Sequence, residues 1–243
     1  MLLNEVEKEN IMNLKREVNI LSQLIHPSIH KFIGYSPSNF DQEPYPVIIT
    51  EYSSNGSLSN IIELERNSRS PEGWTETKKI INIFGISSAM SYLHKHHIIH
   101  RDLKLANILE DDNLFPKIAD FGLSKISHQD TNSMSTESTP NFKGTPIYCA
   151  PEIWNDYNYS MTSDVYAFAM TVYEILTLNE PFKTCNLPTF YTKVVVNGER
   201  LALDDSIPDC YQNLIQRCWA QNPDERPTFD EILDDIRNND SFI

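Results

Sequence analysis

The chain has 243 residues, of which 34 are Asp or Glu and 20 are Lys or Arg, and its formal net charge is −14. Its length and its 40% hydrophobic residues are typical of a globular chain with a buried core, and they argue against a disordered one. The acidic balance argues against a protein that tracks nucleic-acid phosphates, although it leaves a local nucleotide site open. No apolar run approaches the roughly 20 residues of a membrane span.

Cysteine usage and the first residues indicate the compartment. Cys149, Cys185, Cys210 and Cys218 form no CxxC pair and are too few for a disulfide scaffold of this length. Residues 1–5 include an acid and no basic segment, which argues against a secretory signal. We therefore expect a cytoplasmic protein that has neither a membrane nor nucleic acid as a partner.

The first half of the chain predicts one helix, two strands and two further helices. Apolar residues recur every three or four positions from Leu14 to Ile25, and Pro27 ends this helix. Ser57 is a plausible N-cap for the next helix. Strands are predicted at 32–35 and 47–52, and helices at 58–64 and 75–97.

The second half predicts a hairpin, a polar loop and a run of helices. Residues 108–110 and 117–119 flank a turn of Asp and Asn residues, which indicates a small hairpin. Residues 124–145 are polar, and a loop of that length is usually functional. Helical patterns occupy 161–178, 189–197, 208–220 and 227–238. The architecture is thus a short mixed segment followed by a mainly helical body, with a seam near residues 53–57.

The stretch His-Arg-Asp-Leu-Lys-Leu-Ala-Asn at 100–107 carries the most chemical information. Asp102 and Asn107 lie five residues apart in a loop, and the predicted hairpin returns Asp120 toward them. Carboxylate and amide oxygens suit Mg²⁺, which also prefers phosphate oxygens. An ammonium group beside them, from Lys104, suits the charge that spreads over a phosphoryl group during transfer.

In order and spacing, these motifs resemble those of the eukaryotic protein kinase family. Residues 100–107 match its catalytic loop, 120–122 match Asp-Phe-Gly, and 150–152 match Ala-Pro-Glu. The match runs from about residue 17 to the end of the chain, and its phrases most resemble the tyrosine-kinase-like group of Ser/Thr kinases. The resemblance implies an α+β, protein-kinase-like fold. A partial N-lobe with one helix and about two strands would occupy 1–53, and a mainly helical C-lobe would occupy 54–243.

The resemblance also implies a role for each matched catalytic residue. Asp102 would accept the proton of the substrate hydroxyl or orient that hydroxyl, and Lys104 would contact the γ-phosphate. Asn107 and Asp120 would hold the metal, so ATP and Mg²⁺ are the expected cofactors.

The family's adenine site maps onto a second set of residues. Thr50 resembles the gatekeeper, and backbone groups of Glu51 and Ser53 in the hinge would bond the base. Leu109 would form the floor under the base, and Asn60 stands where many members hold the ribose with an acid.

Structural and regulatory parts of the family appear as well. Glu17 lies nine residues before His26, where the family places its helix-C glutamate. Asp164 would anchor the catalytic loop from beneath, and Arg226 would pair with Glu152. Leu21, Phe32, His100 and Phe121 match the hydrophobic spine, and Gly122 completes the Asp-Phe-Gly motif.

Lys104 and Thr145 resemble the Ser/Thr pattern, so the expected partner is a protein substrate with a serine or threonine. Arg101 suggests control by phosphorylation of the activation loop, because an arginine can pair with a phosphate. The candidate sites are Ser133, Ser135, Thr136, Ser138 and Thr139; the alternative for each is a solvated polar residue.

Three other groups of residues have plainer interpretations. The histidines between residues 94 and 100 could suggest a metal site, but a helix end beside a loop explains them without the paired ligands of a zinc site. Cys149 has the pattern of an ordinary buried thiol. Asp234, Asp235 and Asp240 indicate a solvated helix face and tail.

Two parts of the family pattern are missing from the sequence. The closest glycines, Gly73 and Gly85, are 12 residues apart, so no glycine-rich phosphate loop is present. Lys8 lies nine residues from Glu17, about 13 Å along a shared helix and on another face, so it is not the family's paired lysine. Because these parts provide positioning and charge stabilisation, we expect slower phosphotransfer than in an intact relative.

Three alternatives follow from these gaps. In the first, the chain is a Ser/Thr kinase whose sequence lacks the first strands. In the second, it is a non-catalytic, pseudokinase-like binding module. In the third, it is a kinase that another chain completes. The presence of Asp102, Lys104, Asn107 and Asp120 favours the first, because selection for inactivity usually removes such residues.

Overall fold

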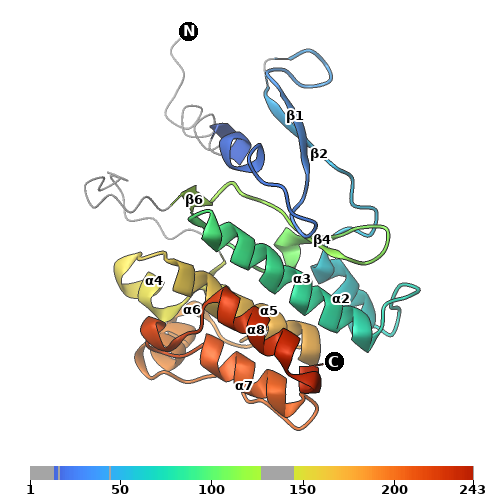
Figure 1. Ribbon diagram of the computed structural model, residues 1–243. Coiled ribbons are helices and arrows are strands. Elements are labelled where there is room, and N and C mark those ends of the chain that lie inside the picture. The colour runs from blue at the N-terminus through green and yellow to red at the C-terminus, as the bar shows by residue number, and fades with distance from the viewer. Residues whose placement is uncertain (1–13, 16, 44, 127–144, 243) are drawn as a thin grey trace.

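The computed structural model describes residues 14–242 apart from 16, 44 and 127–144. A short helix and a two-stranded sheet lie at one end of the molecule, and helices make up the rest (Figure 1). No helix within the described residues is long and apolar enough to cross a membrane.

The N-terminal helix ends earlier than the sequence predicts. Helical backbone ends at Leu21 and a turn follows, so Ile25 is 87% exposed and does not continue the apolar stripe. The turn before Pro27 is held by side chains: the Tyr92 hydroxyl accepts a hydrogen bond from the Ile25 N–H at 3.1 Å, and His26 Nδ1 accepts one from Ser28 at 3.1 Å. Pro27 disfavours helical backbone at His26 alone, so it sets a limit that the helix does not reach.

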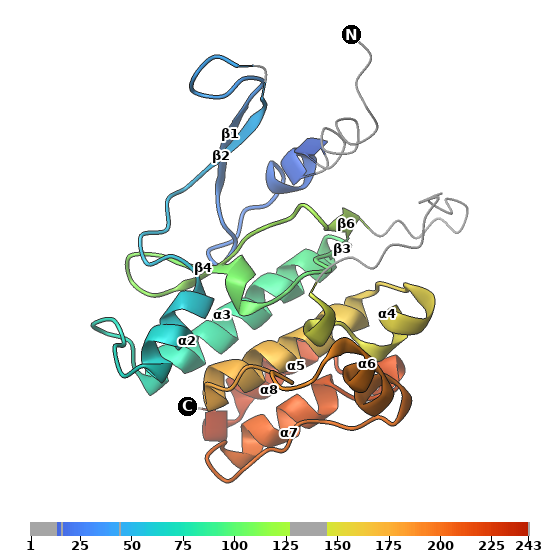
Figure 2. The same cartoon turned by 180° about the vertical axis from the view of Figure 1, so that it is seen from behind.

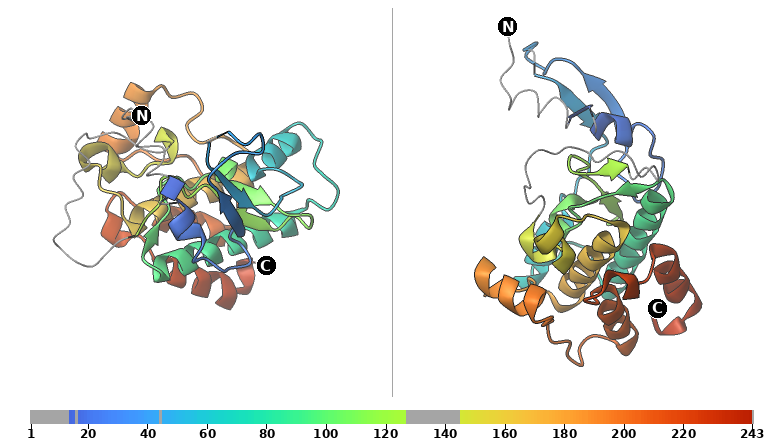
Figure 3. Two further views of the ribbon diagram at one scale, coloured as in Figure 1. Left: turned by 90° about the horizontal axis from the view of Figure 1, so that it is seen from above. Right: turned by 90° about the vertical axis from the view of Figure 1, so that its left-hand side faces the viewer.

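The two predicted strands pair with each other. Strand β1 (Phe32–Ser36) runs antiparallel to β2 (Val47–Thr50), with Tyr35 opposite Ile48. Strand β2 ends before residues 51 and 52, which the sequence pattern includes in it. Figure 3 shows this hairpin extending away from the helical body.

Helices α2 (Leu58–Arg66) and α3 (Glu76–Lys95) begin at side-chain caps. Ser57 accepts a hydrogen bond from the Asn60 N–H, which confirms the predicted cap, and Thr75 accepts one from Lys78. Caps of this kind satisfy N–H groups that the first turn of a helix leaves without partners.

Two small sheets follow α3. Strand β4 (Ile108–Glu110) pairs with β5 (Pro116–Ile118), which confirms the predicted hairpin, and Asp111 caps its turn by accepting hydrogen bonds from Asn113 and Phe115. The sequence pattern misses the second sheet, in which β3 (Ile98–Ile99) pairs with β6 (Lys125–Ile126), because two-residue strands leave no periodicity.

The remaining helices build the body of the molecule. The α-helices are α4 (Pro151–Asp156), α5 (Met161–Thr177), α6 (Leu187–Phe190), α7 (Asp209–Cys218) and α8 (Phe229–Asn238). Short 3₁₀ turns are η1 (Leu105–Asn107), η2 (Pro146–Tyr148), η4 (Pro223–Glu225) and η5 (Asp240–Phe242). The predicted helix at 189–197 is instead one α-turn followed by a π-helix, η3 (Tyr191–Val196).

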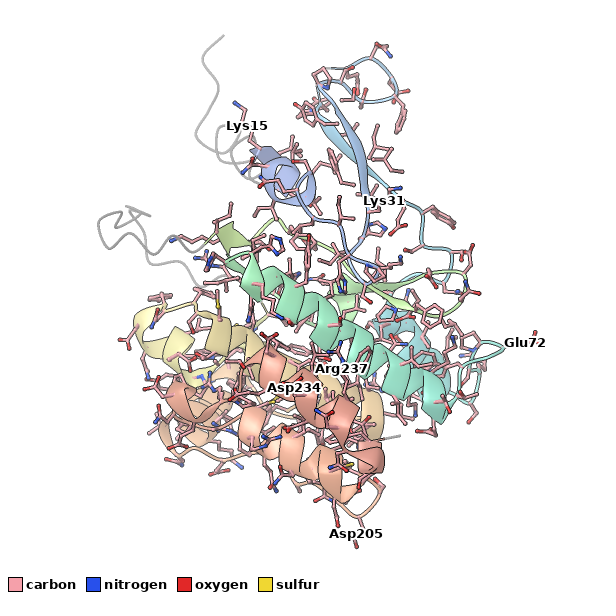
Figure 4. The ribbon with its side chains drawn as sticks, in the orientation of Figure 1. Lys15, Lys31, Glu72, Asp205, Asp234 and Arg237 are labelled. Carbon is pink, nitrogen blue, oxygen red and sulfur yellow. The ribbon has the colours of Figure 1, made fainter. Side chains whose placement is uncertain are left out.

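Helix α5 forms the centre of the core. Every residue from Ser163 to Ile175 is buried, and α5 contacts both α3 and α7. Figures 1 and 2 show it between these two helices from opposite sides. In contrast, Asp234 and Arg237 lie exposed on the outer face of α8 (Figure 4), as the sequence predicts for Asp234.

Candidate active site

The loop after β3 and the β4–β5 hairpin bring the predicted catalytic residues into one region. The Ala119 N–H donates to the Asn107 carbonyl at 2.9 Å, so the chain leaving the hairpin is tied to the end of the loop. Asp120 follows directly, and its backbone is left-handed at φ +61°. This local path places Asp120 beside the loop that carries Asp102.

Asp102 is the centre of a hydrogen-bond cluster. Its Oδ2 accepts from Lys104 Nζ at 2.7 Å and from Asn107 Nδ2 at 2.8 Å. Its Oδ1 accepts from the Thr145 N–H at 3.1 Å. The residue is 9% exposed, so the carboxylate is fixed in orientation while it keeps contact with solvent. A carboxylate held in this way can accept a proton from a bound hydroxyl.

Lys104 and Thr145 join the loop to the segment before α4. Lys104 Nζ donates to Thr145 Oγ1 at 2.7 Å as well as to Asp102. The ammonium group therefore bridges two parts of the chain that are 41 residues apart. The sequence places both residues in the site, and the structure brings them into contact.

The oxygen atoms near Asp120 fit a magnesium ion. Asn107 uses its Nδ2 to donate to Asp102, so its Oδ1 faces no donor among the described residues. Asp120 is exposed, and from the described residues its Oδ1 accepts one long hydrogen bond, 3.4 Å, from the Gly122 N–H. One amide oxygen and one carboxylate are the hard ligands that Mg²⁺ takes together with phosphate oxygens.

Asp164 anchors the catalytic loop from within the core. It is 1% exposed, and its carboxylate accepts from the backbone N–H groups of His100 at 2.8 Å and Arg101 at 2.9 Å. Arg101 has a left-handed backbone at φ +73°, which costs about 1–2 kcal/mol for a residue with a side chain. Two charge-assisted hydrogen bonds offset that strain. His94 Nε2 lies 3.0 Å from the same carboxylate, a contact that the sequence gives no direct sign of.

The predicted spine residues pack in the same core cluster. Phe121 and His100 are fully buried, and their rings meet edge to face with centroids 5.3 Å apart. Leu21 belongs to this cluster, and Phe32 packs against it.

The predicted adenine-binding residues lie between β2 and α2. The Ser53 N–H has no backbone hydrogen-bond partner among the described residues, so it is available to a ligand. The Glu51 carbonyl also has no backbone partner there, but the His30 side chain lies within hydrogen-bond reach of it. The Glu51 carboxylate turns elsewhere, to the Lys31 N–H at 2.9 Å. Thr50 ends β2 opposite Phe32. Leu109 lies half-buried in β4, and Asn60 is exposed on α2.

Glu17 points toward Asp120 rather than toward a cation. A Cβ atom added at Gly122 would lie 3.8 Å from Glu17 Oε2. Burial, and then the negative charge of Asp120, raise the pKa of Glu17 above its usual value. Within the described residues no lysine or arginine forms an ion pair with it.

Glu152 and Arg226 form a buried ion pair that ties α4 to the segment before α8. Two nearly parallel hydrogen bonds, 2.7 and 2.9 Å long, join the guanidinium group to both carboxylate oxygens. The Arg226 side chain has no exposed surface. The sequence places these two residues as a pair, and the structure has them in contact.

A second polar network lies beside the site and is missed by motif matching. Glu174, 5% exposed on α5, accepts from Arg66 on α2 at 2.7 Å and from the Tyr148 hydroxyl. It thereby links α2, α5 and the turn that follows Thr145. The signal in the sequence is that residues 161–178 are mostly apolar and contain only two acids, Asp164 and Glu174. A charged residue that is buried in such a helix is normally paired.

The remaining sequence predictions have mixed outcomes. The candidate phosphorylation sites, Ser133 to Thr139, lie outside the described residues. Arg101 stacks its guanidinium group on Tyr159, 4.9 Å from the ring centroid. Burial raises the pKa of the Cys149 thiol to about 12, so the thiol is unreactive. The described residues contain no group of three or more His, Cys, Asp or Glu side chains placed to hold a metal ion.

Comparison with known proteins identifies the class. The family model for protein tyrosine and serine/threonine kinases matches residues 1–236. The chain is 36% identical to the probable serine/threonine-protein kinase drkD of Dictyostelium discoideum, over 96% of this chain and 17% of that protein. It is 32% identical to the serine/threonine-protein kinase CTR1 of Arabidopsis thaliana, over 94% and 27%.

A third relative is the serine/threonine/tyrosine-protein kinase HT1 of Arabidopsis thaliana, which is 34% identical over 94% of this chain and 55% of that protein. The chain therefore belongs to the protein kinase family, and its fold is the α+β, protein-kinase-like fold with a helical C-lobe and a small N-lobe. It spans 17%, 27% and 55% of the length of these three relatives.

Proposed function

We propose that this chain is a serine/threonine kinase domain that transfers the γ-phosphate of ATP to a protein hydroxyl in the cytoplasm. The observation that carries the proposal is the Asp102 cluster, in which Lys104, Asn107 and Thr145 hold one carboxylate in a fixed orientation. Family membership supports the reaction class, and the relatives' printed names support the hydroxyl class.

The proposed mechanism follows from the positions of these side chains. The substrate hydroxyl donates a hydrogen bond to Asp102, its oxygen bonds to the γ-phosphorus, and the bond from that phosphorus to the bridging β–γ oxygen breaks. The hydroxyl proton passes to the Asp102 carboxylate. Lys104, 2.7 Å from Asp102, places a positive charge beside the transferring group.

Asn107 and Asp120 would hold Mg²⁺ through oxygen atoms that face no strong donor among the described residues. When bound, the ion would neutralise phosphate charge. The Glu51 carbonyl and the Ser53 N–H would orient the adenine, with Leu109 beneath it and Thr50 at the end of β2.

We also propose that Thr145 favours a serine or threonine substrate. Its hydroxyl accepts a hydrogen bond from Lys104, and its N–H donates one to Asp102. Thr145 therefore lies between the proposed base, Asp102, and the turn at Pro146–Tyr148. The name of one relative includes tyrosine, so the substrate class has to be read from which amino acid is phosphorylated in the product. After reaction with Mg-ATP and a mixture of casein and histone, acid hydrolysis should yield phosphoserine and phosphothreonine. A product that is mainly phosphotyrosine would overturn this part of the proposal.

A control pair assigns the transfer to this chain. Asp120→Asn removes a proposed metal ligand, whereas Asp205→Asn makes the same change at an exposed acid far from the site, labelled in Figure 4. We expect Asp120→Asn to lower transfer at least about 100-fold, because loss of a positioned electrostatic group costs that much. Asp205→Asn should keep the original rate. Equal rates in the two variants would contradict the proposed metal site.

A second candidate function is a non-catalytic binding module. The observation that favours it is Glu17, whose pKa is raised by burial and by Asp120 with no described cation beside it. This candidate predicts that Mg-ATP raises the melting temperature while no phosphate reaches any protein. Impaired but measurable transfer, lost in Asp120→Asn, would rule it out.

A further inference from the structure

A cavity of about 230 Å³ lies between α3, α5 and the start of α8, apart from the proposed active site. Figure 1 shows α8 beside α3 and in front of α5, and α3 contacts both of the other helices. Apolar side chains make up much of its lining, namely Met161, Val165, Pro227 and Phe229. An apolar ligand would therefore gain free energy by entering it.

The charges at this cavity cancel each other. Lys95 Nζ lies 2.8 Å from Asp230 Oδ1, and Ser91 donates a hydrogen bond to the same oxygen. The cavity therefore offers no unpaired charge to an ionic ligand, which would lose its hydration without compensation. A neutral ligand fits better.

His94 supplies one polar group that is not fully used. Its Nε2 lies 3.0 Å from Asp164, and a carboxylate can only accept, so Nε2 carries the proton. His94 makes no hydrogen bond through Nδ1 to any described residue, and a ring nitrogen without a proton can accept one. The ring also meets Phe229 edge to face, with centroids 5.0 Å apart. The wall thus suits a flat ring that carries one hydrogen-bond donor.

The same histidine connects the cavity to the catalytic loop. Asp164 accepts from His94 and also from the backbone N–H groups of His100 and Arg101, at 2.8 and 2.9 Å. A ligand bound to His94 would change the electron density and position of this ring. The effect reaches the loop through one shared carboxylate.

The volume sets the size of the ligand. An apolar cavity of about 150 Å³ in another protein binds benzene, which has six heavy atoms. By proportion, 230 Å³ accommodates about nine heavy atoms. We propose that this cavity binds a small, neutral, bicyclic aromatic molecule with one hydrogen-bond donor, and that its occupancy is transmitted to the catalytic loop through His94 and Asp164.

The test uses the 243-residue chain with indole and 1-methylindole as probes. The two molecules have nearly the same shape, but methylation removes the N–H donor. Titration followed by ¹H–¹⁵N correlation spectra should show saturable binding of indole, with about tenfold weaker binding of 1-methylindole because one hydrogen bond is lost. The amide signals of His100 and Arg101 should move together with those around His94.

Two variants at one position locate the probe. Ser91 is 4% exposed and lines the cavity. Ser91→Leu and Ser91→Ala both remove the hydrogen bond to Asp230, but only leucine fills the space. Ser91→Leu should weaken indole binding more than tenfold, whereas Ser91→Ala should keep it, with both variants checked for a cooperative melting transition.

The proposal would be overturned by any of three results. Equal affinity for the two probes would contradict the role of His94, and equal affinity of the two variants would place the probe elsewhere. Saturable binding that leaves the His100 and Arg101 amide signals unchanged would contradict transmission to the loop. Each result is independent of whether the chain transfers phosphate.

Discussion

At the scale of single residues, Glu110 is a fully buried acid. Neither carboxyl oxygen forms a hydrogen bond of ordinary geometry with a described residue, although the Asn82 side chain lies close by and donates instead to the Lys78 and Leu114 carbonyls. Its pKa is raised to about 8: burial is the largest cause and Asp111 adds to it, while Asn82 and Lys78 oppose the shift. Glu110 is therefore mostly protonated at pH 7, when it can act as a donor.

This buried acid predicts a dependence of stability on pH. The pKa is about 8 in the folded chain against 4.5 for the ordinary group, so the folded state binds the proton more tightly. The contribution of this bound proton to the free energy of unfolding is full below pH 4.5. It falls by up to about 1.4 kcal/mol per pH unit as the pH rises toward 8, and it is lost above pH 8.

Glu110→Gln should remove this part of the pH dependence, because glutamine stays neutral. Urea unfolding at pH 6, 7, 8 and 9 measures it. Glu63→Gln, at an exposed position on α2, is the matched control and should follow the original profile. Parallel profiles for Glu110→Gln and the original chain would show that Glu110 titrates normally.

At the scale of elements, the Glu152–Arg226 pair holds α4 against the segment that leads to α8. Arg226 also donates to the carbonyls of Ala220 and Thr162, at 2.9 and 3.0 Å. Arg226→Met should destabilise the fold by about 3–5 kcal/mol, because it leaves a buried carboxylate and two carbonyls without donors. Urea unfolding gives the value.

The exposed pair of Arg217 and Asp235 provides the control for that change. Its side chains are 41% and 40% exposed, so Arg217→Met should cost no more than about 1 kcal/mol. Similar losses in the two methionine variants would mean that burial does not set the strength of these pairs.

Sequence reasoning succeeds for elements with strong local signals and fails where packing decides. Helix α3 and the β4–β5 hairpin follow from periodicity and turn residues. Helix α4, six residues long, is too short for a periodic signal. The π-helix η3 has i→i+5 hydrogen bonds, and six residues are too few to distinguish its period from that of an α-helix. In the site, family motifs identify Asp102 and Asp164, whereas the contact of His94 with Asp164 depends on the packing of α3 against α5.

At the scale of the whole molecule, the two ends differ in burial. Helix α5 is enclosed by other helices, whereas the β1–β2 hairpin leaves Ile33 61% and Tyr35 47% exposed. We propose that the boundary between the N-lobe and the C-lobe lies at residue 53. A two-stranded sheet with little cover is marginally stable, so it should open before the core does.

Amide hydrogen exchange at pH 7 tests this difference. Amides of β1 and β2 should exchange at least about 100-fold faster than those at the middle of α5, because local opening requires less free energy than global unfolding. Mg-ATP should slow exchange near residues 50–53 if the proposed adenine site is correct. Uniform protection across hairpin and core would show that the molecule opens as one unit.

The central claim is that Asp102 is the base of a phosphoryl-transfer site, and single-turnover transfer from Mg-ATP to casein tests it most directly. Asp102→Asn should lower the rate at least about 100-fold, the usual contribution of a positioned base, while Mg-ATP still raises the melting temperature. Asp205→Asn should react at the original rate. A rate for Asp102→Asn within about twofold of the original, or no transfer by the unaltered chain, would contradict the claim.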